Sequence, residues 1–243
     1  MSDPSPAATT VAQRLAAARQ GVRDAAALAG RDPDGVRILL ATKTMPAAVI
    51  KEAFAAGGTL IGENRVQEVL AKADELADVP HETHFIGHLQ SNKVNQVLPY
   101  IRCLQTLDSA ALAARLQARL AVLDRGLDVL IQVNVSGEAS KSGAPLAAVR
   151  DLVATVADAP LLTLRGFMTI GLNSPHRAAV RRGYAELAGI RDRAIGEEWP
   201  GAAAATELSM GMSGDYPDAI AEGATIVRLG SAVFGARPPF GPR

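Results

Sequence analysis

Residues 36–64 read VRILLATKTMPAAVIKEAFAAGGTLIGEN and contain one complete strand–helix–strand unit. The apolar run over residues 36–41 predicts a buried strand, and residues 46–56 have the composition of a helix. Two glycines end that helix, and residues 59–61 predict a second short strand. Consecutive strands separated by a helix favour a parallel sheet covered by helices.

The same alternation continues along the chain. Six more strands are predicted at residues 84–86, 103–107, 129–135, 161–170, 207–210 and 225–229. Helices are predicted at residues 62–76, 93–97, 145–157, 177–195 and 215–222, with another after a cap at Asp108 or Ser109. A further helix begins at Val11 and stops before Gly30.

Eight strands, each followed by a helix or helical turn, predict a single α/β domain: a (β/α)8 TIM-type barrel with an extra N-terminal helix. A doubly wound sheet is the main alternative, although it rarely uses eight short, evenly spaced strands. We expect the barrel to span residues 9–237. Residues 1–8 are predicted to be a disordered N-terminus and residues 238–243 a C-terminal tail.

Composition narrows the functional class. The 25 Lys and Arg residues balance the 25 Asp and Glu residues, so nothing favours a nucleic acid or an anionic membrane as partner. The single cysteine, Cys103, lies in an apolar run, which favours a buried thiol over a reactive one. The N-terminus does not resemble a signal peptide, and no apolar run could span a bilayer. We therefore expect a soluble cytoplasmic protein.

The carboxyl ends of barrel strands carry binding groups, so the strand map nominates site residues. Lys43 follows the first strand, which delivers it to the barrel mouth from an apolar segment. Desolvation lowers the pKa of a lysine and makes its amine a nucleophile for an aldehyde. The alternative is an ordinary solvated lysine.

Small-residue turns follow the seventh and eighth strands at Ser213-Gly214 and Gly230-Ser231. Loops at these positions commonly bind phosphate in barrels, because glycine lets backbone N–H groups approach an anion and a helix N-terminus adds its dipole. Ser213 could equally cap the following helix. A lysine and a phosphate cup at one barrel mouth would suit a phosphorylated aldehyde.

Arg228 lies on the eighth strand and shares a face with Gly230. An arginine at the barrel mouth indicates either a role in binding or a structural ion pair, for which Glu207 is the candidate carboxylate. Asn64, His88 and Met168 also lie at strand ends, after the second and third strands and at the end of the sixth.

Several motifs together resemble the pyridoxal phosphate homeostasis proteins, also described as the proline synthase co-transcribed homologues. The motifs are Ala41-Thr42-Lys43-Thr44, Ile61-Gly62-Glu63-Asn64-Arg65, residues 84–93 (HFIGHLQSNK), Gly166-Phe167-Met168-Thr169-Ile170, residues 208–215 (LSMGMSGD) and Val227-Arg228-Leu229-Gly230. The resemblance runs in order from about residue 10 to residue 237. That fold is similar to the N-terminal barrel of alanine racemase.

The resemblance implies that the cofactor is pyridoxal 5′-phosphate (PLP), bound as a Schiff base to Lys43. It implies that Ser213, Gly214, Gly230 and Ser231 hold the phosphate and that Arg228 faces the pyridine nitrogen. Asn64, His88 and Met168 would line the other sides of the cofactor. A cationic neighbour keeps the ring nitrogen unprotonated and weakens the electron sink that carbanion chemistry needs. No catalytic residue and no metal site are predicted.

The departures from the racemase pattern indicate a protein that handles the cofactor without catalysis. The racemases carry a tyrosine four residues after their lysine, where this chain has Ala47. They also add a C-terminal β domain with a second tyrosine base, which we expect to be missing because the sequence reaches Arg243 soon after the eighth strand. A PLP-dependent amino-acid racemase-like enzyme is the alternative, and a regulatory module that no longer uses PLP is a third.

The expected protein buffers PLP and delivers it to PLP-dependent apoenzymes, its candidate protein partners. We expect a monomer. The sequence leaves open whether Lys93 or Lys141 forms a second cofactor site, although both are expected to be solvated.

Overall fold

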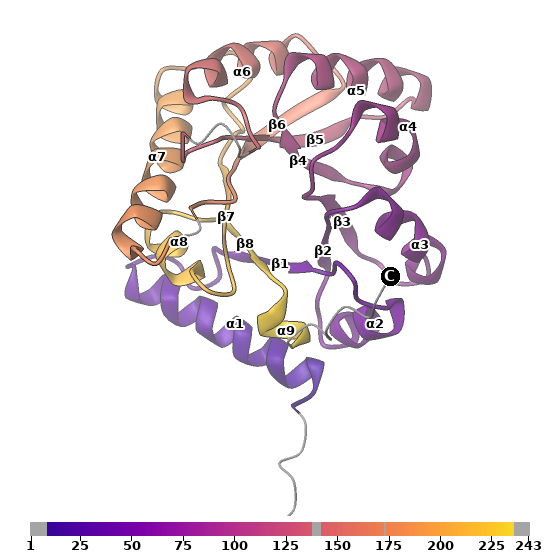
Figure 1. The fold of residues 1–243 in the computed structure, drawn as a ribbon, viewed down its shortest axis with the longest axis vertical. Coiled ribbons are helices and arrows are strands. Elements are labelled where there is room, and N and C mark those ends of the chain that lie inside the picture. Colours follow the sequence, from indigo (N-terminus) through magenta and orange to yellow (C-terminus); the bar gives the residue numbers. More distant parts are fainter. Residues whose placement is uncertain (1–8, 138–141, 173, 236–243) are drawn as a thin grey trace, which may run out of the picture.

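The computed structural model describes residues 9–137, 142–172 and 174–235. Its centre is a closed barrel of eight parallel strands in sequential order, with β1 paired to both β2 and β8 (Figure 1). The strands are β1 Arg37–Ala41, β2 Leu60–Glu63, β3 Glu82–Phe85, β4 Cys103–Leu107, β5 Leu127–Gln132, β6 Leu162–Met168, β7 Glu207–Met212 and β8 Ile226–Leu229. The predicted TIM-type barrel is confirmed.

Helices surround the barrel (Figure 1). They are α1 Val11–Leu28, α2 Ala47–Ala55, α3 Val66–Leu76, α4 Val94–Val97, α5 Ala110–Leu123, α6 Val149–Ala157, α7 Arg177–Gly196, α8 Tyr216–Ala221 and α9 Ser231–Phe234, with 3-10 turns η1 Ser91–Lys93, η2 Leu98–Tyr100 and η3 Leu146–Ala148. The extra N-terminal helix α1 packs against α2, α8 and α9. No helix in the described ranges is both long and apolar enough to cross a membrane.

Local sequence signals account for several helix ends. Thr10 caps α1 by accepting a hydrogen bond from the Gln13 N–H, and the Gln13 side chain accepts one from the Thr10 N–H. Gly30, at a φ of 68°, follows the end of α1, as predicted. Ser109 caps α5. The predicted helix over residues 62–76 is wrong at its start, because Gly62 and Glu63 belong to β2 and helix α3 begins only at Val66.

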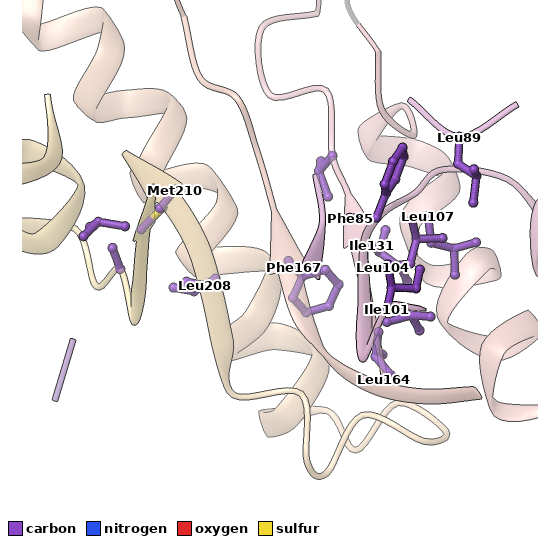
Figure 2. Packing of buried hydrophobic residues seen from close by; sticks show 14 of the residues in the cluster. Phe85, Leu89, Ile101, Leu104, Leu107, Ile131, Leu164, Phe167, Leu208 and Met210 are labelled. Carbon is purple, nitrogen blue, oxygen red and sulfur yellow. The ribbon is translucent and has the colours of Figure 1, made fainter. Parts of the chain in front are cut away.

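The main hydrophobic core fills the space between the barrel and its helices. Figure 2 shows Phe85, Leu104 and Leu107 grouped in this layer, and Phe167 belongs to the same core cluster. Successive side chains along a strand point to opposite faces of the barrel wall. Strand residues that alternate with those of the outer core therefore face the barrel interior. Two smaller clusters lie there, one of Leu39, Leu60 and Ile226 and one of Cys103, Leu130 and Met168.

Gly166 allows β6 to pass close to β7. Its φ is 152°, and a Cβ at this position would lie 1.9 Å from the backbone oxygen of Glu207. No side chain fits at that distance, so only glycine suits the position. The register between β5 and β6 shifts just before this residue, between Val129 and Leu130. The irregularity lies in the strand that carries Met168 and Thr169 to the barrel mouth.

The predicted disordered N-terminus, the C-terminal tail and Lys141 lie outside the described residues. Cys103 is 2% exposed, so the expectation of a buried thiol is confirmed. Burial also raises the pKa of the Cys103 thiol, which keeps the sulfur protonated at neutral pH.

Candidate functional site at the barrel mouth

A cavity of about 250 Å³ opens at the carboxyl ends of β1, β7 and β8. Six of the nine predicted site residues line it: Lys43, Ser213, Gly214, Arg228, Gly230 and Ser231. Residues 43, 213–214 and 228–231 are far apart in the sequence, and the closed barrel brings them to one rim. Met45, Met212 and Phe234 supply apolar parts of the lining.

Lys43 lies in a tight turn that follows β1. The Met45 N–H donates to the Thr42 carbonyl across 3.0 Å and closes the turn. Thr44 has a φ of 65°, a left-handed conformation that is unusual for a β-branched residue. Unfavourable backbone conformations of this kind persist only where the surrounding structure holds them.

Arg228 is a buried cation that projects from β8 toward the barrel interior, since its neighbours Val227 and Leu229 belong to the outer core. Its Nη2 donates to the Thr169 carbonyl across 2.8 Å, and its Nη1 donates to Ser209 Oγ across 2.9 Å. Burial lowers the pKa of the Arg228 guanidinium to about 10, so it stays charged at neutral pH. The predicted alternative, an ion pair with Glu207, is wrong.

Glu207 instead bonds Arg37 at 2.6 Å. Both side chains lie at the opposite end of the barrel, where they line a small cavity with charged residues from β3, β5 and β6. Residue 207 begins β7 and Arg228 lies near the end of β8, so the strand lengths separate the two groups along the barrel axis.

Polar contacts continue from Arg228 through the barrel. Ser209 Oγ lies 2.6 Å from Gln105 Oε1, and Gln105 Nε2 lies 2.8 Å from His84 Nδ1. Burial lowers the pKa of His84 to about 3, so its imidazole is neutral at ordinary pH. The sequence reasoning missed these residues. The available signal was a glutamine and a histidine within predicted barrel strands.

The Asp215 side chain stabilises the turn after β7 through two hydrogen bonds. Its Oδ1 accepts from the Met212 N–H across 2.7 Å, and its Oδ2 accepts from the Tyr184 hydroxyl across 2.7 Å. Burial raises the pKa of Tyr184 far above its usual range, so the phenol remains a donor. The turn is therefore fixed before any ligand arrives.

The two small-residue turns lie against each other. Ser213 Oγ accepts from the Ala232 N–H across 3.3 Å. A Cβ on Gly214 would meet nothing within 4 Å, so this side of the turn is open, whereas a Cβ on Gly230 would lie 3.3 Å from the Ala41 carbonyl oxygen. Hydroxyls, accessible backbone and two cationic side chains around one cavity fit a phosphorylated aldehyde.

The other three predicted site residues do not line this cavity. Met168 is fully buried against Cys103 and Leu130. The His88 side chain is 61% exposed, with its Nδ1 3.8 Å from an Asp108 carboxylate oxygen. Asn64 is half-buried, and its backbone packs against Gly87. Their contact with a ligand remains a prediction.

A larger cavity of about 710 Å³ lies near the amino ends of β1, β2 and β3, beside α1. The cationic groups in its lining are already engaged: Arg19 Nη1 donates to the Ala56 carbonyl across 2.7 Å, Arg37 bonds Glu207 and Arg23 bonds Asp34. Binding sites in barrels lie at the opposite, carboxyl end of the strands. We therefore assign the smaller cavity as the candidate site.

The chain is similar to several known proteins. Residues 14–238 match the family described as alanine racemase, N-terminal domain. The chain is 43% identical over 230 residues to a protein of Pseudomonas aeruginosa named pyridoxal phosphate homeostasis protein, covering 94% of this chain and 96% of the relative. A protein of the same name from Escherichia coli is 40% identical over 231 residues, covering 93% and 97%.

Among solved structures, the chain is similar to PipY of Synechococcus elongatus with PLP bound. The TM-score is 0.82 and the sequence identity 33%, and the match covers 93% of this chain and 100% of PipY.

Proposed function

The chain belongs to the alanine racemase N-terminal domain family and, within it, to the pyridoxal phosphate homeostasis proteins, and we propose that it binds PLP at the barrel mouth and holds it for the cell without catalysing a reaction on it. The observation that carries the proposal is the single cavity lined by Lys43, Arg228 and the two small-residue turns. The PLP bound to PipY and the names of the relatives support the choice of cofactor.

Each part of the cavity has a role in the proposal. Ser213, Gly214, Gly230 and Ser231 bind the phosphate through hydroxyl and backbone N–H groups. The Lys43 amine binds the aldehyde carbon as a Schiff base, and one water leaves. When bound, PLP supplies a reactive carbonyl and a ring that can accept electrons.

The position of Arg228 favours a protein that binds PLP over one that catalyses a reaction with it. Thr169 and Ser209 fix its buried guanidinium, so the positive charge is held at this position in the cavity lining. A fixed cation disfavours a proton on the pyridine nitrogen, because the two charges would repel at short range. With its ring nitrogen unprotonated, PLP at this site would supply only a weak electron sink for proton abstraction from an amino acid.

Incubation with amino acids tests the non-catalytic part of this proposal. The protein, saturated with PLP, would be incubated overnight with L-alanine and other amino acids and the products separated by chiral chromatography. We expect no turnover above that of free PLP. Turnover that disappears in Lys43→Ala would instead establish a racemase-like enzyme.

Delivery of PLP to apoenzymes, a monomeric state and a cytoplasmic location belong to the same proposal. Mixing the PLP-loaded protein with a PLP-dependent apoenzyme tests delivery. Reactivation faster than with an equal concentration of free PLP supports direct transfer, whereas an equal rate supports release into solution.

A further inference from the structure

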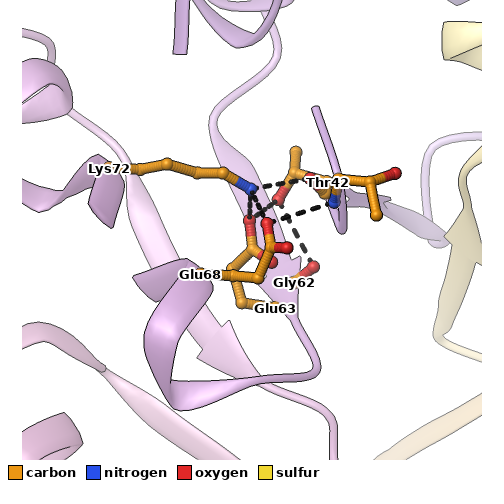
Figure 3. A network of polar contacts seen from close by, with 6 residues as sticks. Thr42, Gly62, Glu63, Glu68 and Lys72 are labelled. Atoms are coloured by element: carbon orange, nitrogen blue, oxygen red, sulfur yellow. Dashed lines mark hydrogen bonds and ion pairs between the residues drawn. The ribbon is translucent and has the colours of Figure 1, made fainter. Parts of the chain in front are cut away.

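A buried charged cluster lies directly behind the turn that carries Lys43. Lys72 Nζ on α3 donates to Glu63 Oε1 at 2.7 Å, to Glu68 Oε2 at 2.7 Å and to the Thr42 carbonyl at 3.0 Å (Figure 3). The Lys72 side chain is 10% exposed and that of Glu63 1% exposed. All three ammonium protons of Lys72 therefore have partners.

The cluster binds both residues that flank Lys43. Thr42 donates its hydroxyl to Glu63 Oε1 across 2.7 Å and accepts from Lys72 through its carbonyl. The Thr44 N–H donates to Glu68 Oε2 across 3.1 Å. Side chains of α3 and β2 therefore form hydrogen bonds with the residues on both sides of Lys43 (Figure 3).

The turn needs such support. A tight turn with a positive φ at its third residue normally has glycine there, and this one has Thr44 at a φ of 65°. In this conformation of the turn the Thr44 N–H donates to Glu68, and the contact helps to hold the strained residue in place. The direction in which residue 43 leaves the backbone depends on the same dihedral angles.

Lys72 keeps the two carboxylates together. Glu63 and Glu68 both bond to it, and Glu63 Oε2 is buried with no hydrogen-bond partner among the described residues. Burial raises the pKa of Glu63, which shows that the site tolerates its charge poorly. Without the ammonium group, repulsion between the carboxylates would release Glu68 from the turn.

We propose that Lys72 and Glu68 are positioning residues for Lys43: they fix the turn so that the Lys43 amine meets the aldehyde carbon of a PLP whose phosphate is already bound. Neither residue touches the cofactor in this account. The inference rests on the proposed function, because it concerns how the same cavity forms its covalent bond.

Two ligands separate positioning from general structural support. PLP binds through phosphate, ring and aldehyde, whereas pyridoxine 5′-phosphate lacks the aldehyde and can use only the first two. In Lys72→Met we expect the dissociation constant for PLP to rise about tenfold or more, since small misplacements of a reacting group are costly. The constant for pyridoxine 5′-phosphate, measured by calorimetry, should change less than about twofold, because the phosphate cup lies on β7 and β8.

Lys51→Met is the matched control. Lys51 lies on the neighbouring helix α2 and forms an exposed ion pair with Asp78 at 2.9 Å, so removing it should leave both dissociation constants unchanged. Glu68→Gln provides a milder test that keeps an amide oxygen for the Thr44 N–H but weakens the bond to Lys72. It should weaken PLP binding less than Lys72→Met does, again without affecting pyridoxine 5′-phosphate.

Equal weakening of both ligands, or unchanged PLP binding in a folded Lys72→Met protein, would overturn the inference. If Lys72→Met does not fold, Glu68→Gln decides by the same comparison. Failure of the proposed function looks different, because the unmodified protein would then form no covalent adduct with PLP.

Discussion

Arg228 Nη1 donates to Ser209 Oγ across 2.9 Å, and this bond sets the direction of every hydrogen bond that follows it through the barrel. A guanidinium has no acceptor, so Ser209 must accept from it and donate its own proton to Gln105 Oε1. The Gln105 amide nitrogen then donates to His84 Nδ1, which must be unprotonated. A fixed charge at the barrel mouth thus selects the tautomer of a histidine deep in the barrel.

This directionality predicts an acid-sensitive stability. The pKa of His84 falls from 6.5 to about 3 on folding, so between these values the unfolded chain binds a proton that the folded protein does not. The contribution of His84 is therefore complete above pH 6.5 and is lost as the pH falls toward 3. We expect a loss of about 1 to 2 kcal/mol in the free energy of unfolding between pH 7 and pH 5.

His84→Asn isolates that contribution, because its amide oxygen can accept from Gln105 but does not titrate. Urea denaturation of both proteins at a series of pH values gives the difference directly. The exposed His176→Asn is the control and should follow the unmodified protein. Parallel curves for the unmodified protein and His84→Asn would contradict the account.

Ser209→Ala should destabilise the fold by about 1 to 3 kcal/mol. It removes the acceptor for Arg228 Nη1 and the donor for Gln105 Oε1, and both groups are buried. The exposed Ser91→Ala should change stability by less than about 0.5 kcal/mol. Thermal or chemical denaturation measures both. A Ser209→Ala protein as stable as the control would mean that Arg228 and Gln105 find other partners.

Gly214→Ala should separate binding from folding. A Cβ there meets nothing within 4 Å, so the fold should keep its stability or gain up to about 1 kcal/mol from the less flexible unfolded chain. The methyl group would block close approach of a phosphate to the backbone, and we expect PLP to bind about tenfold more weakly or worse. Gly196→Ala, at another position where a Cβ meets nothing within 4 Å, is the control. It should change stability in the same way as Gly214→Ala but leave PLP affinity unchanged.

Binding titrations and denaturation curves on the same two variants check this prediction. Unchanged PLP affinity in Gly214→Ala would show that the phosphate does not approach the turn after β7.

Much of the fold could be predicted because its signals are local. Each of the eight observed strands overlaps a predicted one, and residues 103–107 were predicted with the observed bounds of β4. The start of α3 was missed because β2 contains Gly62 and Glu63, which alone suggest a turn and a helix start. Both are buried in the barrel wall, so tertiary pairing overrides the local preference.

The candidate site was only partly predictable. The rule that strand ends carry function nominated Lys43 and Arg228, which line one cavity. The rule predicts where a residue lies around the rim, but not how deep its side chain lies or where it points. Met168, which the rule also nominated, packs inside the barrel, and its contact with a ligand stays a prediction. The Lys72 cluster joins residues of β2 and α3 to the turn after β1, and no spacing in the sequence indicates that contact.

The most direct test of the account is to find the lysine that carries PLP. The protein would be incubated with PLP, reduced with borohydride, digested and analysed by mass spectrometry, with Lys43→Ala treated in parallel. We expect one phosphopyridoxyl group, on Lys43, and in Lys43→Ala neither that label nor the visible absorption band of the unreduced complex. A label on another lysine such as Lys93, or an unchanged band in Lys43→Ala, would contradict the central claim.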